Sequence, residues 1–136
     1  MINYLIYNHI SGKIDRLYVG AASSVATQLQ SGEAFILNSG NVNDLTHYVS
    51  SKTITPKPAN PITADKTTII ANDNDEITFS NIPNPTDVTI TGPDNSIMTF
   101  TETDETLIFT TDLEGSYKFN FECFPKLDKV IEIVAS

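Results

Sequence analysis

Apolar and polar residues alternate with a period of two along most of the chain, and Thr, Ile, Val, Tyr and Phe dominate the alternating segments. This pattern is typical of half-buried β-strands, whereas apolar periodicity of helix length is hard to find. In the first part of the chain it predicts strands at 2–8, 13–19, 33–37, 46–49 and 52–55. The first two flank the Gly-bearing turn HISG and are expected to form a hairpin.

Alternation along the first strand gives one apolar face, with Ile2, Tyr4 and Ile6, and one mixed face, with Asn3, Leu5 and Tyr7. The segment 21–30 (AASSVATQLQ) is the one plausible helix, with Ser23 or Ser24 as its N-terminal cap, and a loop is the alternative.

The second part of the chain shows strand-sized blocks at intervals of about ten residues, separated by segments rich in turn-forming residues. Within each block, apolar residues occupy one face and Thr, Lys, Asn or Glu the other. This pattern predicts an antiparallel, immunoglobulin-like β-sandwich and therefore a mainly all-β protein. The seven blocks are 66–71, 76–82, 87–92, 97–102, 106–111, 116–124 and 128–135.

A proline-rich segment separates the two parts. Pro56, Pro58 and Pro61 fix their own φ angles and favour extended geometry in the residues before them, which makes a short, semi-rigid spacer. We therefore predict an N-terminal β docking module at 1–55, a linker at 56–61 and an immunoglobulin-like domain at 62–136. The alternative is a loop inside a single domain.

Charge changes at the same place. Residues 1–60 carry four cations and three anions, a net charge of +1, while residues 61–136 carry four cations and fourteen anions, a net charge of −10. An acidic surface repels phosphate backbones and anionic lipids, so we expect neither nucleic acid nor a membrane as partner. The N-terminus lacks the features of a signal peptide and no window is apolar enough to span a membrane. These features predict a soluble protein that is made in the cytoplasm or released by another route.

The segment DLEGSYKFNF resembles the start of strand F in immunoglobulin-like domains, where a tyrosine hydroxyl bonds back to the backbone. The acid would be Asp112 or Glu114, followed by Gly115 and Tyr117. Phe119 stands where antibody-type domains have a cysteine, so aromatic packing alone would hold this core.

The order of motifs along most of the chain also resembles small virion proteins of tailed bacteriophages. The resemblance implies a structural role in the particle, expected at the tail, with no catalysis. Apart from Asn43 and Asp44, region 20–45 lies outside the resemblance. The matching residues are Tyr7, Gly12 and Ile14; Asn43, Asp44, Thr46, His47, Tyr48 and Val49; Pro56, Lys57, Pro58 and Pro61; and Gly115, Tyr117, Phe124, Pro125 and Leu127.

Candidate chemistry is sparse. His9 and His47 are the only histidines, and Asp44 could orient His47, although a surface or interface histidine is the simpler interpretation. Cys123, the only cysteine, excludes an internal disulfide and a thiolate zinc cluster, and it alternates with aromatic residues as a small buried hydrophobe would. We therefore expect no enzyme, no catalytic residues and no cofactor.

The acidic turns 73–76 and 112–114 raise the possibility of a shared calcium ion, because calcium prefers oxygen ligands. No twelve-residue calcium-loop pattern supports that interpretation, and solvated turns are the alternative. We therefore expect no metal.

The resemblance to phage virion proteins implies a virion structural protein, tail-associated and made in the host cytoplasm. With the charge contrast between the two parts, it leads us to expect that the first module docks onto other virion (tail) proteins while the acidic second module projects outward. Hydrophobic, Thr-rich edge strands would be covered by neighbours in a homo-oligomer. Two alternatives stay open. One is a capsid decoration protein, and the other is an adhesion module that contacts a glycan or receptor on the host surface.

Overall fold

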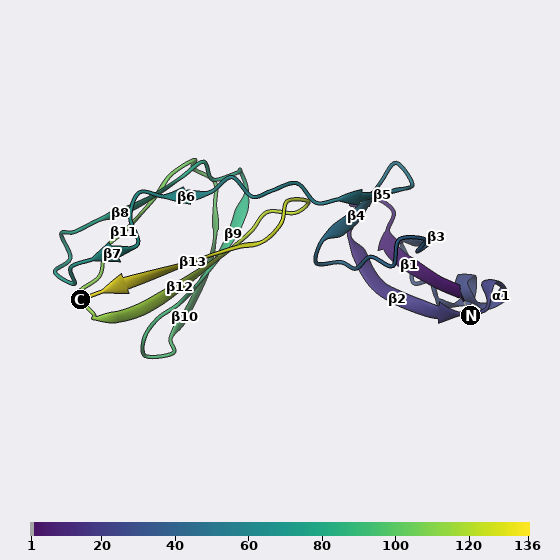
Figure 1. Ribbon diagram of the computed structural model, residues 1–136, viewed down its shortest axis with the longest axis horizontal. Coiled ribbons are helices and arrows are strands. Elements are labelled where there is room, and N and C mark those ends of the chain that lie inside the picture. The colour runs from purple at the N-terminus through teal and green to yellow at the C-terminus, as the bar shows by residue number, and fades with distance from the viewer. Residues whose placement is uncertain (1) are drawn as a thin grey trace. The chain divides into compact units, whose positions relative to one another are not determined.

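The computed structural model describes residues 2–136 and is mainly β (Figure 1). The chain divides into two compact units, one ending at Pro58 and the other running from Ala59 to Ser136. Each sheet takes all its strands from one unit. The boundary between the units falls inside the segment 56–61, which the sequence predicts as a linker. The two ends of that segment, however, are part of the compact units. Pro56 is the last residue of a strand in the first unit, and Asn60 is buried in the second.

The first unit combines a three-stranded antiparallel sheet with a separate hairpin. In the sheet, of order β2-β1-β3, β1 pairs with both neighbours. Strand bounds agree with the sequence prediction to within one residue. The strands are β1 (Ile2–Asn8), β2 (Ile14–Gly20), β3 (Glu33–Leu37), β4 (His47–Ser50) and β5 (Thr53–Pro56), the last two forming the hairpin.

A short helical segment connects β2 to β3. It consists of α1 (Ala22–Val25) and a 3₁₀ turn (Ala26–Gln28), so the predicted helix is present but much shorter than 21–30. The predicted cap is wrong, because the capping residue is Ala21 and no side chain caps the helix. Ser24 lies inside the helix and donates its N–H to the Ala21 carbonyl at 3.0 Å. No helix within residues 2–136 is long and apolar enough to cross a membrane.

The core of the first unit is formed on the mixed face of β1. Leu5 and Tyr7 pack with Ile14 and with Val49 of β4, so the hairpin covers this face. Tyr4 and Ile6, on the opposite face, are buried as well. A central strand that is buried on both faces explains why alternation in the sequence did not identify the core face.

The second unit is a sandwich of two sheets (Figure 1). The five-stranded sheet has the order β10-β9-β12-β13-β7 and the three-stranded sheet the order β11-β8-β6. The strands are β6 (Thr63–Ala64), β7 (Thr68–Ile69), β8 (Ile77–Ser80), β9 (Thr86–Thr91), β10 (Ile97–Glu102), β11 (Leu107–Phe109), β12 (Gly115–Glu122) and β13 (Lys129–Ala135).

Two features of this unit differ from the prediction. It has eight strands in place of seven, because β6 has only two residues and is too short to show alternation. The sheets are also not wholly antiparallel, since β7 pairs with β13 in parallel. The block 66–71 contributes just two residues to that pairing, Thr68 and Ile69.

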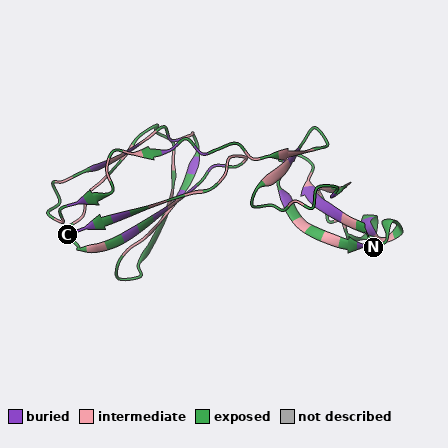
Figure 2. Ribbon diagram, in the orientation of Figure 1, coloured by how far each residue is buried: buried purple, intermediate pink, exposed green. Residues whose placement is uncertain are grey.

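Aromatic side chains lie in the interior of the sandwich, as the sequence predicts, but they do not form this core alone, because buried aliphatic residues such as Ile77, Val88 and Ile133 pack with them. Phe79 from one sheet contacts Phe119 and Phe121 from the other, with ring centroids 4.6 and 5.3 Å apart. All three side chains are fully buried. The alternation of buried and exposed residues is visible along β12 and β13 (Figure 2).

Candidate functional site

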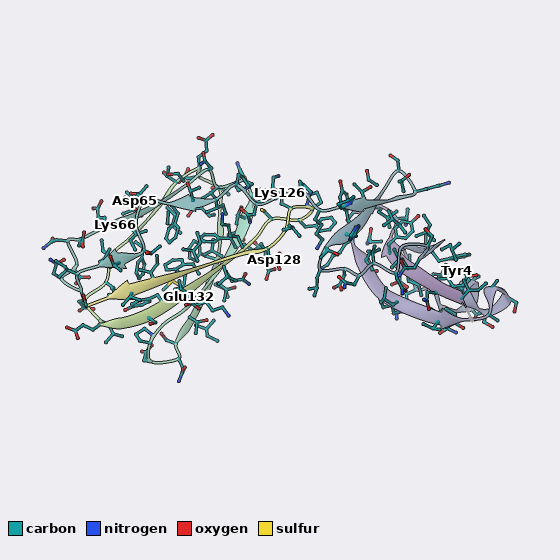
Figure 3. The ribbon with its side chains drawn as sticks, viewed as in Figure 1. Tyr4, Asp65, Lys66, Lys126, Asp128 and Glu132 are labelled. Carbon is teal, nitrogen blue, oxygen red and sulfur yellow. The ribbon has the colours of Figure 1, made fainter. Side chains whose placement is uncertain are left out.

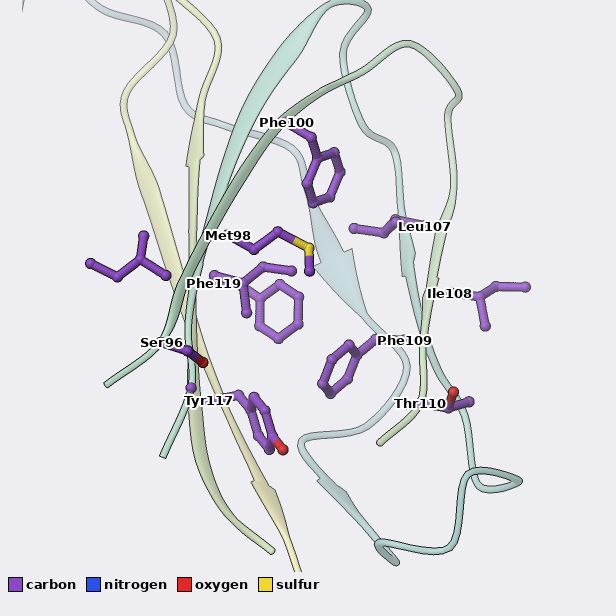
Figure 4. A pocket seen from close by; sticks show the side chains of 12 residues that line it. Ser96, Met98, Phe100, Leu107, Ile108, Phe109, Thr110, Tyr117 and Phe119 are labelled. Atoms are coloured by element: carbon purple, nitrogen blue, oxygen red, sulfur yellow. The ribbon is translucent and has the colours of Figure 1, made fainter. Parts of the chain in front are cut away.

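A cleft opens between the edge strands of the two sheets of the second unit. β10 ends the five-stranded sheet, β11 ends the three-stranded sheet, and residues 103–106 connect them. The cleft has a volume of about 430 Å³ and an apolar lining (Figure 4). Figure 4 shows Met98 and Phe100 of β10 facing Leu107 and Phe109 of β11, whereas Ile108 points away.

Strand register explains why these side chains line the cleft. Met98 is aligned with Ile90 and through it with Phe119, in a row that continues the inner face of the sheet. On β11, Leu107 and Phe109 are aligned with the buried Phe79 and Ile77. Met98 is nevertheless 62% exposed although it faces inward. The interior of the sandwich is therefore open to solvent at this edge.

Tyr117 closes the floor of the cleft at one end. Its hydroxyl donates to the Leu113 carbonyl at 2.7 Å and lies 2.6 Å from Oγ1 of Thr111. This is the backbone contact that the sequence predicts for a tyrosine corner. The two acids considered for the corner, Asp112 and Glu114, are exposed.

A second apolar surface lies on the first unit. Ile2, Phe35 and Leu37 share the face of the sheet that carries Tyr4, and all three are exposed. The ring of Phe35 meets that of Tyr4 edge-on, with centroids 5.8 Å apart. We call Ile2, Phe35 and Leu37 the β3 patch.

An ionic cluster beside the β3 patch was not predicted from the sequence. Arg16 Nη1 donates to Glu33 Oε2 at 2.5 Å, and Nη2 donates to the Gln28 carbonyl. Glu33 also accepts the Gln30 N–H at 2.7 Å. These hydrogen bonds lower the pKa of Glu33 to about 2, and the bond from Arg16 has the largest effect. They tie the helical segment to β2 and β3, so we assign the cluster a structural role.

Each of the two histidines has a local contact through its Nδ1 atom. His9 Nδ1 lies 2.7 Å from the Gly32 carbonyl, and His47 Nδ1 lies 2.7 Å from Thr46 Oγ1. The partner of His47 Nδ1 is thus Thr46 and not Asp44, which was considered from the sequence.

Cys123 is buried, as its alternation with aromatic residues predicts. Burial is the main reason that the pKa of its thiol is raised. Asn60 Nδ2 donates to the Cys123 sulfur at 3.5 Å, and Asn60 Oδ1 accepts the Ile62 N–H at 3.1 Å. Cys123 thus packs beneath the start of the second unit, where a thiol is not activated.

The acidic turns are held by hydrogen bonds. Asp75 binds Lys66 (labelled in Figure 3) through Oδ1 at 2.5 Å and accepts the Ile70 N–H at 2.9 Å. The two turns are neighbours, since Asp73 donates its N–H to the Thr111 carbonyl at 3.1 Å. Within residues 2–136, no three His, Cys, Asp or Glu side chains are grouped as a metal site would require.

Comparisons with known proteins add no relative to these observations. No protein-family model matches the chain, and no significant match is found among curated proteins or solved structures.

Proposed function

We propose that residues 59–136 form an immunoglobulin-like domain. Two observations support the proposal. The first is the sheet order, in which the β6, β8 and β11 strands face a sheet built around β9, β12 and β13. The second is the Tyr117 hydroxyl bond to the backbone four residues earlier, at the start of the strand where such domains have their tyrosine corner.

We further propose that the protein is a non-enzymatic structural component of a tailed bacteriophage virion, associated with the tail. The first unit docks onto other virion proteins, and the second projects its acidic surface into solvent. The order of motifs shared with small phage virion proteins motivates this assignment. It also implies that the protein is made in the host cytoplasm and resides in the particle.

The observation that carries the division of roles is the contrast between two compact units with separate sheets. The first combines a net charge of +1 with the exposed β3 patch, a surface suited to burial against a protein partner. The second carries a net charge of −10, which favours solubility and opposes close packing of like surfaces.

Two full-length variants, each with one exposed aliphatic residue changed to Lys, test which unit docks. Leu37→Lys places a cation in the β3 patch, and Ile97→Lys places one on the outer face of β10. Both residues are exposed on edge strands, so both variants should fold. We expect mass spectrometry of gradient-purified particles to find the wild type and Ile97→Lys at equal copy number and Leu37→Lys strongly depleted.

The opposite pattern, with Ile97→Lys depleted and Leu37→Lys retained, would reverse the roles of the units. Absence of the wild-type chain from purified particles would refute the virion assignment. Electron microscopy of the particles then distinguishes a tail position from a capsid decoration, and binding of wild-type chain to a glycan array would favour the adhesion alternative.

A further inference from the structure

The cleft between β10 and β11 has the properties of a binding site for an extended peptide. Both of its walls are sheet edges, and neither β10 nor β11 pairs with a strand on its outer side within the described chain. Such edges present unpaired backbone N–H and C=O groups, which a further strand can satisfy. Proteins normally protect them with Lys, Pro or a bulge, but residues 97–101 (IMTFT) and 107–109 (LIF) contain no charge and no proline.

The cleft also offers contacts for side chains. A bound strand directs every second side chain to the same face, and here that face would meet Met98, Phe100 and Phe109. These residues line an apolar space of about 430 Å³, so alternate Val- or Ile-sized side chains can be buried.

The charge around the cleft identifies the chemistry of the partner. Residues 92–110, which contain both strands of the cleft, have four Asp and Glu and no Lys, Arg or His. Asp94 precedes one end of β10, while Glu102 and Asp104 lie at the other end, where the chain turns into β11. A strand with basic residues at both ends would therefore be attracted along its length.

A second copy of the same unit fits this site less well. It would bring another net charge of −10 against the same acidic rim, and like-charge contacts oppose association. The apolar cleft with its acidic ends instead favours a partner of opposite charge.

We propose that the cleft between β10 and β11 binds an extended segment of another protein, apolar at alternate residues and basic at both ends, by adding it as a strand to one of the two free edges. The inference does not depend on the virion assignment. It can be tested with the purified full-length chain alone.

The probe is a fluorescent peptide of sequence KKTVTVTVTKK, and its binding is measured by anisotropy. Two matched peptides serve as controls: EETVTVTVTEE reverses the terminal charges, and KKTVTPTVTKK interrupts the strand with proline. We expect the first peptide to bind at least about tenfold more tightly than either control, and its affinity to fall as salt is raised.

Neighbouring residues of β10 supply the matched protein variants. Met98→Lys places a cation inside the cleft, whereas Thr99→Lys, at an exposed residue on the opposite face of β10 that does not line the cleft, makes the same change in net charge outside it. We expect Met98→Lys to weaken binding by about tenfold or more and Thr99→Lys by about twofold or less. Circular dichroism checks that both variants fold.

Amide hydrogen exchange identifies the mode of binding. Strand addition should slow exchange in 97–102 or in 107–109 when the peptide is bound. Equal binding of the basic and acidic peptides, equal loss in the two variants, or unchanged exchange in both strands would overturn the proposal. So would a dimer of the free chain, seen by sedimentation, that Met98→Lys disrupts, since a second copy would then occupy the cleft.

Discussion

The Tyr117 hydroxyl joins the start of β12 to the chain just before it. The side chain is nearly buried and contacts Phe109, with ring centroids 5.0 Å apart, so its two hydrogen bonds are formed largely out of water. We expect Tyr117→Phe to lower the free energy of unfolding of the second unit by about 1–2 kcal/mol, since the Leu113 carbonyl loses its donor. Urea denaturation measures the change.

The exposed neighbour Ser116 provides the control for that measurement. Ser116→Ala should change stability by no more than about 0.5 kcal/mol. If Tyr117→Phe changed stability as little as this, packing of the Tyr117 ring, and not its hydroxyl bonds, would stabilise the start of β12.

Glu33 makes the stability of the first unit depend on pH. Its folded pKa of about 2 lies below the ordinary value of 4.5, so between these values the folded state binds fewer protons than the unfolded state. The stabilisation is present above about pH 4.5 and is lost as the pH falls toward 2. We expect Glu33→Gln to reduce the pH dependence of unfolding in this window, measured through the amide NMR signals of β1.

Glu114→Gln makes the same change of charge at an exposed residue of the other unit and should leave the pH dependence of the first unit unaltered. If Glu33→Gln also left it unaltered, the ion pair with Arg16 would not be the source of the acid sensitivity.

At the scale of single residues, the sequence predicted positions whose role follows from local alternation. The burial of Cys123 is an example, whereas the backbone contact of Tyr117 was expected from the resemblance of DLEGSYKFNF to the start of strand F. The Arg16–Glu33 pair could not be predicted in this way, because it depends on β2 and β3 flanking β1 on opposite sides. The same register brings the helical segment within reach of Arg16.

At the scale of elements, Gly12 joins the first hairpin to β4. Its backbone accepts the Val49 N–H at 2.8 Å, and a Cβ at this position would lie 2.0 Å from the Val49 carbonyl oxygen. Gly32 provides a matched comparison, because its φ of +83° is close to the +81° of Gly12 but nothing lies within 4 Å of the corresponding Cβ.

We therefore expect the two Gly→Ala substitutions to differ. Gly32→Ala should cost about 1 kcal/mol, the penalty of a left-handed conformation for alanine. Gly12→Ala should cost at least about 2 kcal/mol more, because β4 must also move away from the hairpin. Equal effects in thermal unfolding would show that the close approach of Val49 is not needed for the fold.

Element bounds were the part of the fold that the sequence predicted best, since β1, β3 and β10 begin and end where alternation does. The two-residue strands were harder to find because they have too few residues to alternate. The cleft could not be predicted at all. It depends on β10 and β11 being the edges of their sheets, and strand order is set by pairing between distant segments.

At the scale of the whole molecule, the two units should respond differently to salt. Repulsion within a unit of net charge −10 weakens its folded state, and added salt screens that repulsion, while a unit of net charge +1 has little to screen. We expect calorimetry to show two unfolding transitions. Raising the salt from about 0.01 to 0.15 M should raise the unfolding temperature of the second unit and leave that of the first unit unchanged.

Limited proteolysis can assign the transitions by identifying which unit is cleaved first on heating. A single transition that moves as a whole with salt would argue against this assignment of charge effects to the second unit.

The division of roles requires that the two units are folded independently, and amide hydrogen exchange of the full-length chain tests this most directly. Leu5→Ala and Phe121→Ala each remove a fully buried side chain, one from each unit, at an expected cost of about 2–5 kcal/mol. We predict that Leu5→Ala speeds exchange in β1–β5 alone and Phe121→Ala in β6–β13 alone. Faster exchange throughout the chain in either variant would contradict the account.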